Sequence, residues 1–370
     1  MPEDRFPFNR MRVLLTNLTL ATRTGTEIVT RDLALGLLQD GHEPCVFSPE
    51  LGDVADDLAL GGVPVVSRLQ DVPFPPDIVH GHHHVETTLA LSHFGTVPGI
   101  FVCHDRFAWH DTPPRLDAIR RYVAVDRSCL ERLVVGARVP RERTRIILNA
   151  VDLRRFVRRE RLPEVPKRAL FFSSFLKDGT ALDLLRGACE AAGIELDVAG
   201  PSVGSPISRP EELLGKYDLV FGRGRCALEA LAAGCAVILF SWMGLGPMVT
   251  ADQVSELREW NLGVRCLQER PTITGIACQI ARYDRADAAL VTEFIRTNAS
   301  LESAVAEYVR LYEEVLSDSA RVTTSIRDVV EALALNTGAL ETELREAAEP
   351  ASMAPLPRTA ADYNRHRDPS

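Results

Sequence analysis

Short apolar runs alternate with helical patterns along most of this chain, and this alternation limits the folds that the chain can adopt. Residues 11–17 are apolar on both faces and rich in β-formers, which suits a central parallel strand covered by helices on both sides. Residues 27–39 then place apolar side chains near one helical face, and Gly41 follows as a left-handed cap. This spacing predicts a doubly wound α/β domain. Its other strands are predicted at 45–47, 63–66, 77–80, 100–104, 122–125 and 145–148.

A second strand–helix series begins at residue 169, after a stretch rich in arginine and proline at 153–168. We interpret that stretch as a linker between two Rossmann-like domains, residues 11–152 and 169–299. An amphipathic helix is predicted to follow at 300–316. In the second domain, strands are predicted at 169–173, 195–199, 218–221 and 236–240, and helices at 181–192 and 226–233.

The C-terminal part of the chain adds an extra helical segment at 317–348. Two helices are predicted within it, at 324–335 and 339–347, separated by Asn-Thr-Gly. Their apolar positions could pack on the body of the protein or pair two chains into a homodimer, and the sequence leaves both interpretations open. Pro, Ala and charged residues dominate 349–370, so we expect a disordered tail.

Charge and composition exclude several classes of protein. The chain has 42 lysines and arginines against 51 aspartates and glutamates, a formal net charge of −9, which argues against a dedicated nucleic-acid binder. No stretch approaches the roughly 18 apolar residues of a membrane helix, and the polar start lacks the apolar core of a signal peptide. The eight cysteines include no Cys-x-x-Cys pair, so neither a disulfide framework nor a zinc site is expected. We therefore expect a cytoplasmic protein.

The segment 217–239 reads as a strand, a glycine-rich turn, a helix and a second strand. Gly222 and Gly224 let the backbone approach a ligand, and the helix that follows directs free N–H groups at the turn. Arg223 and Arg225 suit phosphate oxygens, and Glu229, one helical turn further, suits the vicinal hydroxyls of a sugar. The alternative is a tight turn with two solvated arginines. With both arginines on a strand-to-helix turn, the sequence favours an anion site.

The run Leu-Glu-Ala-Leu-Ala-Ala-Gly-Cys-Ala-Val at 228–237 resembles the nucleotide-sugar site of the family-4 retaining glycosyltransferases, which have the GT-B architecture. The resemblance implies two Rossmann-like domains facing a cleft, with the helix at 300–316 crossing back to the first domain. It also implies sugar transfer from a nucleotide-sugar donor, with retention of configuration and without a metal or other cofactor. Six further segments agree with the family in order: 11–15, 25–27, 41–43, 76–80, 104–105 and 148–152.

The chain departs from this family at the donor site. The family carries Glu-x7-Glu; Glu229 matches the second glutamate, but Phe221 stands where the first is expected. Of the family's phosphate-binding Arg…Lys pair only Lys177 is present, so we infer that Arg223 and Arg225 neutralise the diphosphate. A catalytically weakened sugar-nucleotide-binding protein and a sugar-nucleotide epimerase of the same architecture remain as alternatives. A nicotinamide-dependent dehydrogenase is disfavoured because the first strand-to-helix loop lacks Gly-x-Gly-x-x-Gly.

His104 is the candidate catalytic residue. It follows an apolar strand at the carboxyl edge of the predicted sheet, where open α/β folds bind ligands. In the resembled family a histidine at this position faces the donor sugar near its reacting carbon. Trp109, a few residues further, could stack on a sugar face or simply pack.

The cluster His-Gly-His-His-His at 80–84 invites a metal interpretation, but His80 is expected to end a strand and the next histidines to point in different directions. The resembled family has a histidine-rich loop at the domain cleft here, so we assign His82 to the acceptor side of the cleft and predict no metal. Gly25, Thr26 and Glu27 face the same cleft by position; the alternative there is a helix entry capped by Thr24 or Thr26.

The implied partners are a nucleotide sugar and an acceptor, which is a sugar, a lipid-linked sugar or a small molecule. No nucleic-acid partner is expected. The arginine-rich stretch at 153–168 suits an anionic membrane surface or a diphosphate-linked acceptor, and equally a solvated hinge. A membrane contact of this kind would place the protein at the inner face of the membrane.

Overall fold

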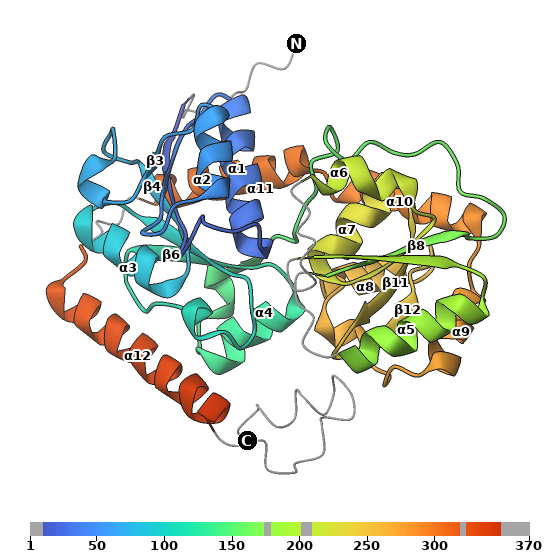
Figure 1. Cartoon of the computed structure of the whole chain (residues 1–370). Helices are drawn as coiled ribbons and strands as arrows, with labels where there is room; N and C mark the ends of the chain where they lie inside the picture. The colour runs from blue at the N-terminus through green and yellow to red at the C-terminus, as the bar shows by residue number, and fades with distance from the viewer. Residues whose placement is uncertain (1–9, 174–178, 201–208, 319–322, 349–370) are drawn as a thin grey trace. The chain divides into compact units, whose positions relative to one another are not determined.

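The computed structural model describes residues 10–173, 179–200, 209–318 and 323–348 (Figure 1). Their contacts divide the chain into two compact units. The first unit contains the described residues up to Ile147 together with those of Leu301–Ser352, and the second contains Leu148–Ser300. Each unit is built on its own sheet, and the predicted α/β class with parallel sheets is confirmed.

The sheet of the first unit is parallel in its described strands, in the order β3-β2-β1-β4-β5-β6-β7. From β1 the chain runs outward through β2 and β3 and then returns to the other side of β1 at β4. The carboxyl ends of β1 and β4 therefore border the point where open α/β sheets bind ligands. The strands are β1 (Arg12–Thr16), β2 (Glu43–Phe47), β3 (Val65–Val66), β4 (Ile78–His82), β5 (Gly99–Cys103), β6 (Ile119–Ala124) and β7 (Thr144–Ile146).

A helix from the far end of the chain completes the first unit. Helix α11 (Leu301–Ser317) packs on α1 (Gly25–Gln39), and a Cβ atom added at Gly36 would lie 2.6 Å from Val305 Cγ2. Val305, Tyr308 and Tyr312 are all buried, and side chains of this size contribute roughly 1.5–3 kcal/mol each on burial. The remaining helices are α2 (Asp53–Leu60), α3 (His84–His93), α4 (Arg127–Glu131) and α12 (Ile326–Ala348).

The second unit has a sheet in the order β12-β11-β10-β8-β9 in the described residues. Among the described strands of this sheet, only the edge strand β12 is antiparallel to its neighbour. Helices α7 and α10 cover one face of this sheet, and α5 and α9 cover the other (Figure 1). The elements are β8 (Arg168–Phe172), α5 (Gly179–Ala191), β9 (Glu195–Ala199), α6 (Pro210–Leu213), β10 (Leu219–Gly222), α7 (Gly224–Ala233), β11 (Ala236–Ser241), β12 (Gly244–Met248), α8 (Val254–Glu259), α9 (Ile273–Ile280) and α10 (Arg285–Asn298).

The arginine-rich stretch at 153–168, called the arginine strap below, packs on the second unit. Phe156 is fully buried in its core, and Arg296 Nη1 donates to the carbonyl oxygen of Phe156 at 2.8 Å. Arg159 N donates to the carbonyl oxygen of Ala233 at 3.0 Å. Backbone and side-chain contacts therefore both attach the central part of this stretch to the second unit.

Two sequence-based predictions of secondary structure are corrected. The segment expected to hold two C-terminal helices forms the single helix α12, in which Thr337 Oγ1 donates to the carbonyl oxygen of Leu333 at 3.0 Å. A glycine inside a helix costs only about 1 kcal/mol, and buried Ala332 and Asn336 offset that cost. The histidine cluster was expected to leave the strand at His80, but β4 continues to His82 and α3 begins at His84. Residues 349–370 lie outside the described residues.

Within the described residues, none of the helices combines the length and the hydropathy needed to cross a bilayer.

Candidate functional site

The carboxyl edge of the second sheet is shaped by two glycines. Gly200 has φ +150°, and a Cβ atom there would lie 1.8 Å from the carbonyl oxygen of Ser173. A Cβ atom at Gly222 would lie 3.0 Å from the carbonyl oxygen of Phe172. The chain changes direction between β8 and β10, so these glycines lie where an open sheet binds ligands.

The turn Gly222–Arg225 leads from β10 directly into α7. Gly224 has φ +57°, a left-handed conformation that favours glycine, and its N–H donates to the carbonyl oxygen of Leu262 at 2.8 Å. Arg223 is the N-cap residue and has no side-chain acceptor with which to cap the helix. An added Cβ at Gly224 would meet no described atom within 4 Å. The positive end of the α7 dipole therefore lies at this turn.

The structure joins two residues for which separate roles were predicted. Arg225 Nε donates to Glu229 Oε1 at 2.7 Å, and their side chains are 12% and 7% exposed. Both side chains are therefore held in the protein beside the turn and are not spread into water. Lys177, the other predicted donor residue, lies outside the described residues.

In the first unit, candidate catalytic His104 belongs to a chain of aromatic groups. Its Nε2 lies 2.6 Å from Nδ1 of His82, whose ring centroid is 4.5 Å from that of His80. The Nδ1 atom of His80 lies 2.5 Å from the hydroxyl of Tyr312 on α11. In the described residues the Nε2 atoms of His80 and His82 are buried without a hydrogen-bond partner.

Burial keeps these histidines neutral. It lowers the pKa of His104 to about 3, with a smaller contribution from His110, and it lowers the pKa of His80 to about 3. The pKa of His82 is also lowered well below its usual value, chiefly by burial. At neutral pH, one ring of the His82–His104 pair donates its N–H and the other accepts it. His104 is therefore a neutral polar group whose ring is held in place by His82.

The histidines lie in a row and do not surround a point. In the described parts of the chain, no group of three or more His, Cys, Asp or Glu side chains is arranged to hold a metal ion. His82 is fully buried, and its ring contacts that of His104. Its side chain therefore has no exposed surface with which to line an acceptor site.

His83 occupies the junction that the sequence analysis missed. It links β4 to α3 with φ +65° and ψ 145°, a strained conformation for a non-glycine residue. Its Nδ1 accepts a hydrogen bond from Leu18 N at 2.9 Å, which ties the ends of β1 and β4 together. Its ring also contacts that of His110, with centroids 4.9 Å apart. The helical pattern that starts immediately after the histidines was the available signal.

The segment Gly25–Glu27 forms the start of α1. The carboxylate of Glu27 is only 1% exposed and accepts hydrogen bonds from Thr24 N and, at 2.9 Å, from Thr22 Oγ1. The carbonyl oxygen of Thr26 accepts from Thr30 Oγ1 at 2.9 Å. These contacts match the helix-entry alternative, with Thr24 as the cap. Only Gly25 faces open space, because an added Cβ there would meet no described atom within 4 Å.

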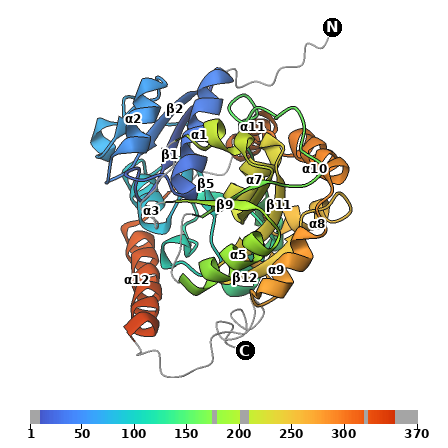
Figure 2. The same cartoon turned by 45° about the vertical axis from the view of Figure 1, so that its right-hand side comes forward.

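Helix α12 holds the loop that carries Trp109. Asn336 Nδ2 donates to the carbonyl oxygen of Trp109 at 2.9 Å, and Trp109 N donates to Glu343 Oε2 at 3.0 Å. His84 Nε2 lies 2.9 Å from the carbonyl oxygen of Ala332, and its Nδ1 lies 2.6 Å from that of Thr112. Figure 2 shows α12 beside α3, which carries His84. The C-terminal helix is therefore part of the surroundings of the loop after His104.

Comparison with known proteins bears on this arrangement. Residues 23–155 match the family model described as Glycosyltransferase Family 4. The chain resembles the family-4 glycosyltransferases. No match was found among curated proteins.

Solved structures share the GT-B fold of these glycosyltransferases. A glycosyltransferase from Rickettsia africae is 14% identical, with a TM-score of 0.57 over 84% of this chain and 100% of its own. HepE from Anabaena, in complex with UDP and glucose, is 15% identical, with a TM-score of 0.58 over 81% and 99%. A UDP-N-acetylglucosamine 2-epimerase described as putative, from Listeria monocytogenes, is 12% identical, with a TM-score of 0.51 over 86% and 99%. Likenesses at these identities establish the fold.

The departure from the family-4 pattern at Phe221 has a structural reason. Phe221 lies inside β10 and is fully buried, with its ring centroid 6.1 Å from that of Phe240. A carboxylate at this position would lie in the apolar core, where an unpaired charge is very costly. The chain therefore cannot supply the family's first glutamate from this position.

Proposed function

We propose that this protein is a glycosyltransferase that moves a sugar from a nucleotide-sugar donor to an acceptor. The observation that carries the proposal is the Gly222–Arg225 turn at the start of α7, with Arg225 held by Glu229. The resemblance of residues 23–155 to the family-4 enzymes supports it.

The turn supplies positive charge where the leaving diphosphate develops negative charge. Gly222 and Gly224 allow the diphosphate to approach the backbone, and the helix end and the guanidinium groups of Arg223 and Arg225 neutralise it. A preorganised donor of this kind contributes about 2.7–4 kcal/mol to transition-state stabilisation. Its positive charge acts without a metal ion, and Glu229 contacts the ribose hydroxyls while it orients Arg225.

His104 contributes as a neutral group at the carboxyl edge of the first sheet. Because its pKa is about 3, it positions a sugar hydroxyl by hydrogen bonding and does not act as a cationic acid. His82 fixes the orientation of its ring through the 2.6 Å contact. Retention of anomeric configuration is the outcome that the family resemblance implies, with a hexose as the transferred sugar.

A thermal-shift screen with uridine, guanosine and adenosine diphosphate sugars tests the donor site, because a ligand that binds only the folded state raises Tm. One class of donor is expected to raise Tm in the wild type and not in Arg225→Ala. Arg186→Ala, which removes a guanidinium from an exposed ion pair on α5, is the matched control and should retain the shift. The absence of a shift with every donor would contradict the proposal.

The epimerase neighbour makes a second activity testable with the same donors. An epimerase converts the donor sugar when no acceptor is present, whereas a transferase leaves it intact or releases it slowly to water. Incubating the bound donor alone and identifying the sugar distinguishes the two. Binding without turnover on a broad acceptor panel would instead indicate a sugar-nucleotide-binding protein.

A further inference from the structure

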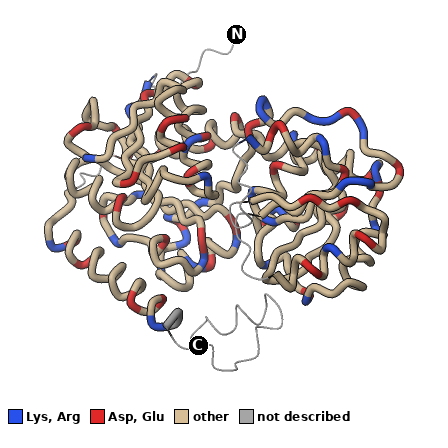
Figure 3. Tube along the Cα trace, viewed as in Figure 1, with Lys and Arg blue, Asp and Glu red and all other residues tan. Residues whose placement is uncertain are grey.

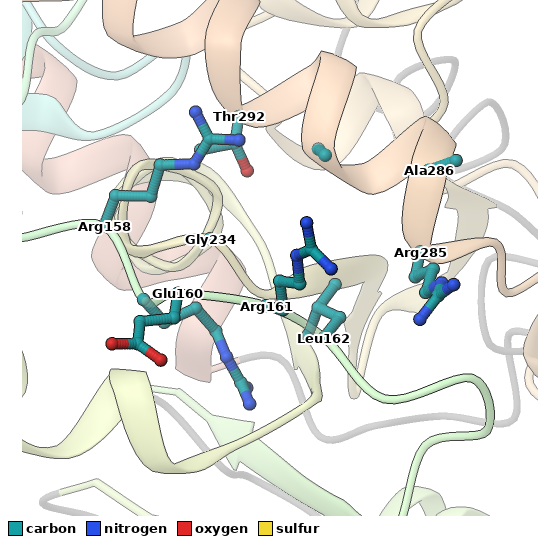
Figure 4. A pocket seen from close by; sticks show the side chains of 10 residues that line it. Arg158, Glu160, Arg161, Leu162, Gly234, Arg285, Ala286 and Thr292 are labelled. Atoms are coloured by element: carbon teal, nitrogen blue, oxygen red, sulfur yellow. The ribbon is translucent and has the colours of Figure 1, made fainter.

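A groove of about 360 Å³ lies on the second unit, between the arginine strap and helix α10 (Figure 4). It is separate from the Gly222–Arg225 turn, because none of those four residues lines it. Its walls carry four arginines and one glutamate. The lining residues are Arg158, Arg159, Glu160, Arg161, Leu162, Gly234, Arg285, Ala286, Ala289 and Thr292.

The groove concentrates positive charge in a chain whose net charge is −9. Basic residues recur along the arginine strap in Figure 3. In Figure 4 the guanidinium of Arg161 lies between those of Arg158 and Arg285, and the carboxylate of Glu160 points away from the opening. The one acidic side chain of the wall therefore does not occupy the space between the three cations.

Three of these guanidinium groups are available to a ligand. Arg161 has no hydrogen-bond or ion-pair partner among the residues that the structure describes. Arg158 pairs with Glu293 at 3.1 Å and Arg285 with Glu164 at 2.5 Å, but the two arginine side chains are 40% and 46% exposed. Exposed pairs of this kind contribute about 0–1 kcal/mol, so a better anion displaces them at little cost.

The groove is held open before any ligand arrives. Arg159, the fourth arginine, is committed to the protein, since its Nη1 donates to the carbonyl oxygen of Tyr217 at 2.5 Å and its Nη2 lies 3.2 Å from Asp218 Oδ1. A Cβ atom at Gly234 would lie 3.0 Å from Arg159 Cγ, which explains the glycine where the strap crosses the end of α7. A preorganised site loses less conformational entropy when it binds.

The opposite wall of the groove is formed by short side chains. Helix α10 presents Ala286 and Ala289, which lie one turn apart and have short side chains. Thr292 Oγ1 donates its hydrogen to the carbonyl oxygen of Ala288 at 3.0 Å, so the wall offers no strong donor besides the guanidinium groups. The volume is at the low end of the roughly 300–1,000 Å³ of small-molecule sites, which limits the ligand to a compact group.

We propose that this groove binds a phosphate-bearing ligand through Arg158, Arg161 and Arg285. Guanidinium groups bind phosphate in a bidentate manner, and three of them around a compact opening match a phosphate or diphosphate group. The group belongs to a soluble phosphate compound or to the headgroup of an anionic lipid. The proposed phosphate site does not depend on the proposed transfer reaction, and the failure of one proposal would not affect the other.

The test compares the wild-type full chain with Arg161→Ala and with Arg158→Ala/Arg161→Ala. One arm is calorimetric titration with inorganic pyrophosphate, and the other is sedimentation with phosphatidylglycerol vesicles against phosphatidylcholine vesicles. Loss of one charge-assisted contact is expected to weaken binding about tenfold, and the double variant should lose it. Binding of pyrophosphate identifies a soluble ligand, and binding of the anionic vesicles alone identifies a headgroup.

Arg186→Ala is the matched control, since it removes the same charge from α5, outside the groove. Arg161 is exposed and unpartnered, so its variant should keep the wild-type Tm, which confirms that it is folded. Three outcomes would overturn the proposal: no binding of either probe by the wild type, wild-type binding by both groove variants, or an equal loss in the control.

Discussion

Arg225 Nε donates to Glu229 Oε1 at 2.7 Å across one turn of α7, and both side chains are almost entirely out of water. A buried ion pair of this kind depends on both partners, because either charge alone in the protein interior is costly. The pair therefore links the stability of the second unit to the charge at its proposed donor site.

Removing Arg225 is expected to destabilise the protein as well as to abolish donor binding. Arg225→Ala removes the positive charge that pairs with buried Glu229, which should lower the free energy of unfolding by about 3–5 kcal/mol. The double variant Arg225→Met/Glu229→Leu should be close to the wild type in stability but should still bind no donor. Urea denaturation and calorimetry separate the two effects. Normal donor binding by the double variant would contradict the proposed donor site.

The buried histidines predict that the protein loses stability as the pH falls. His80 has a folded pKa of about 3, so below its unfolded value of about 6.5 the unfolded chain binds a proton that the folded chain does not. The contribution of His80 to the free energy of unfolding is therefore complete above pH 6.5. It is lost towards pH 3, by about 1.4 kcal/mol per pH unit for one such group. His82, His83 and His104 act in the same direction.

Three acids oppose this trend, and one of them is Asp126, whose pKa burial raises. Burial raises the pKa of Glu86 to about 7 and that of Asp111 to about 8, so their contribution is lost as the pH rises. Burial also lowers the pKa values of His42, His84 and His110. Because seven histidines act against three acids, the unfolding free energy measured in urea should be lower at pH 5.5 than at pH 7. In His80→Gln the unfolding free energy should decrease less between pH 7 and pH 5.5, because this variant takes up about one proton fewer on unfolding. An unfolding free energy that is equal at pH 5.5 and pH 7 would contradict the burial of these histidine rings.

His82 is expected to act on catalysis through His104. Replacing His82 by Phe keeps an aromatic ring in the core but removes the contact with His104, and a misplaced catalytic group costs about 100-fold in kcat. Donor binding, measured by thermal shift, should not change. Since His104 is neutral above about pH 4, wild-type kcat should show no titration of this residue between pH 5 and pH 9. A bell-shaped profile that disappears in His104→Gln would contradict its neutral role.

Gly200 is expected to tolerate no side chain. A Cβ atom there would overlap the carbonyl oxygen of Ser173, which is backbone and cannot move aside as a flexible side chain would. Gly200→Ala should lower the free energy of unfolding by about 3 kcal/mol or more. Gly215→Ala is the control, since no described atom lies within 4 Å of its added Cβ. Equal Tm values for the two variants would show that the strand ends are not close together.

The hold of α12 on the Trp109 loop can be measured by hydrogen exchange. Asn336→Ala removes the donor to the carbonyl oxygen of Trp109 and should cost about 1–3 kcal/mol. Amide exchange in residues 105–112 should become faster. Glu341→Ala, on an exposed position of the same helix, should leave the exchange unchanged. If neither variant changes it, the loop does not depend on α12.

Most strands of the fold could be predicted because buried parallel strands are continuous apolar runs, and the prediction 236–240 matches β11 to within one residue. Edge strand β12 was missed, since Gly-Leu-Gly-Pro-Met has the glycines and proline of a turn. Its pairing with β11 comes from the tertiary structure. The same is true of α12, where Asn336 looks like a helix break and is used to hold Trp109.

The candidate site was predictable in its residue types and less so in its contacts. Local spacing identified the Gly222–Arg225 turn, and the distance of four residues already places Arg225 beside Glu229 on a helix. The packing of His80 against Tyr312 joins residues 232 positions apart, which no local pattern reveals. The burial of His82 followed from the continuation of β4 by two residues, an error of the size that strand ends commonly produce.

The return of α11 to the first unit has a consequence for biosynthesis. The hydroxyl of Tyr312 lies 2.5 Å from Nδ1 of His80, so during synthesis the ring of His80 lacks this partner until residue 312 has been translated. Domains generally fold as units during synthesis, in order from the N-terminus. Here residues Leu148–Ser300 of the second unit are synthesised before α11, so the first unit is completed only after most of the second unit has been made.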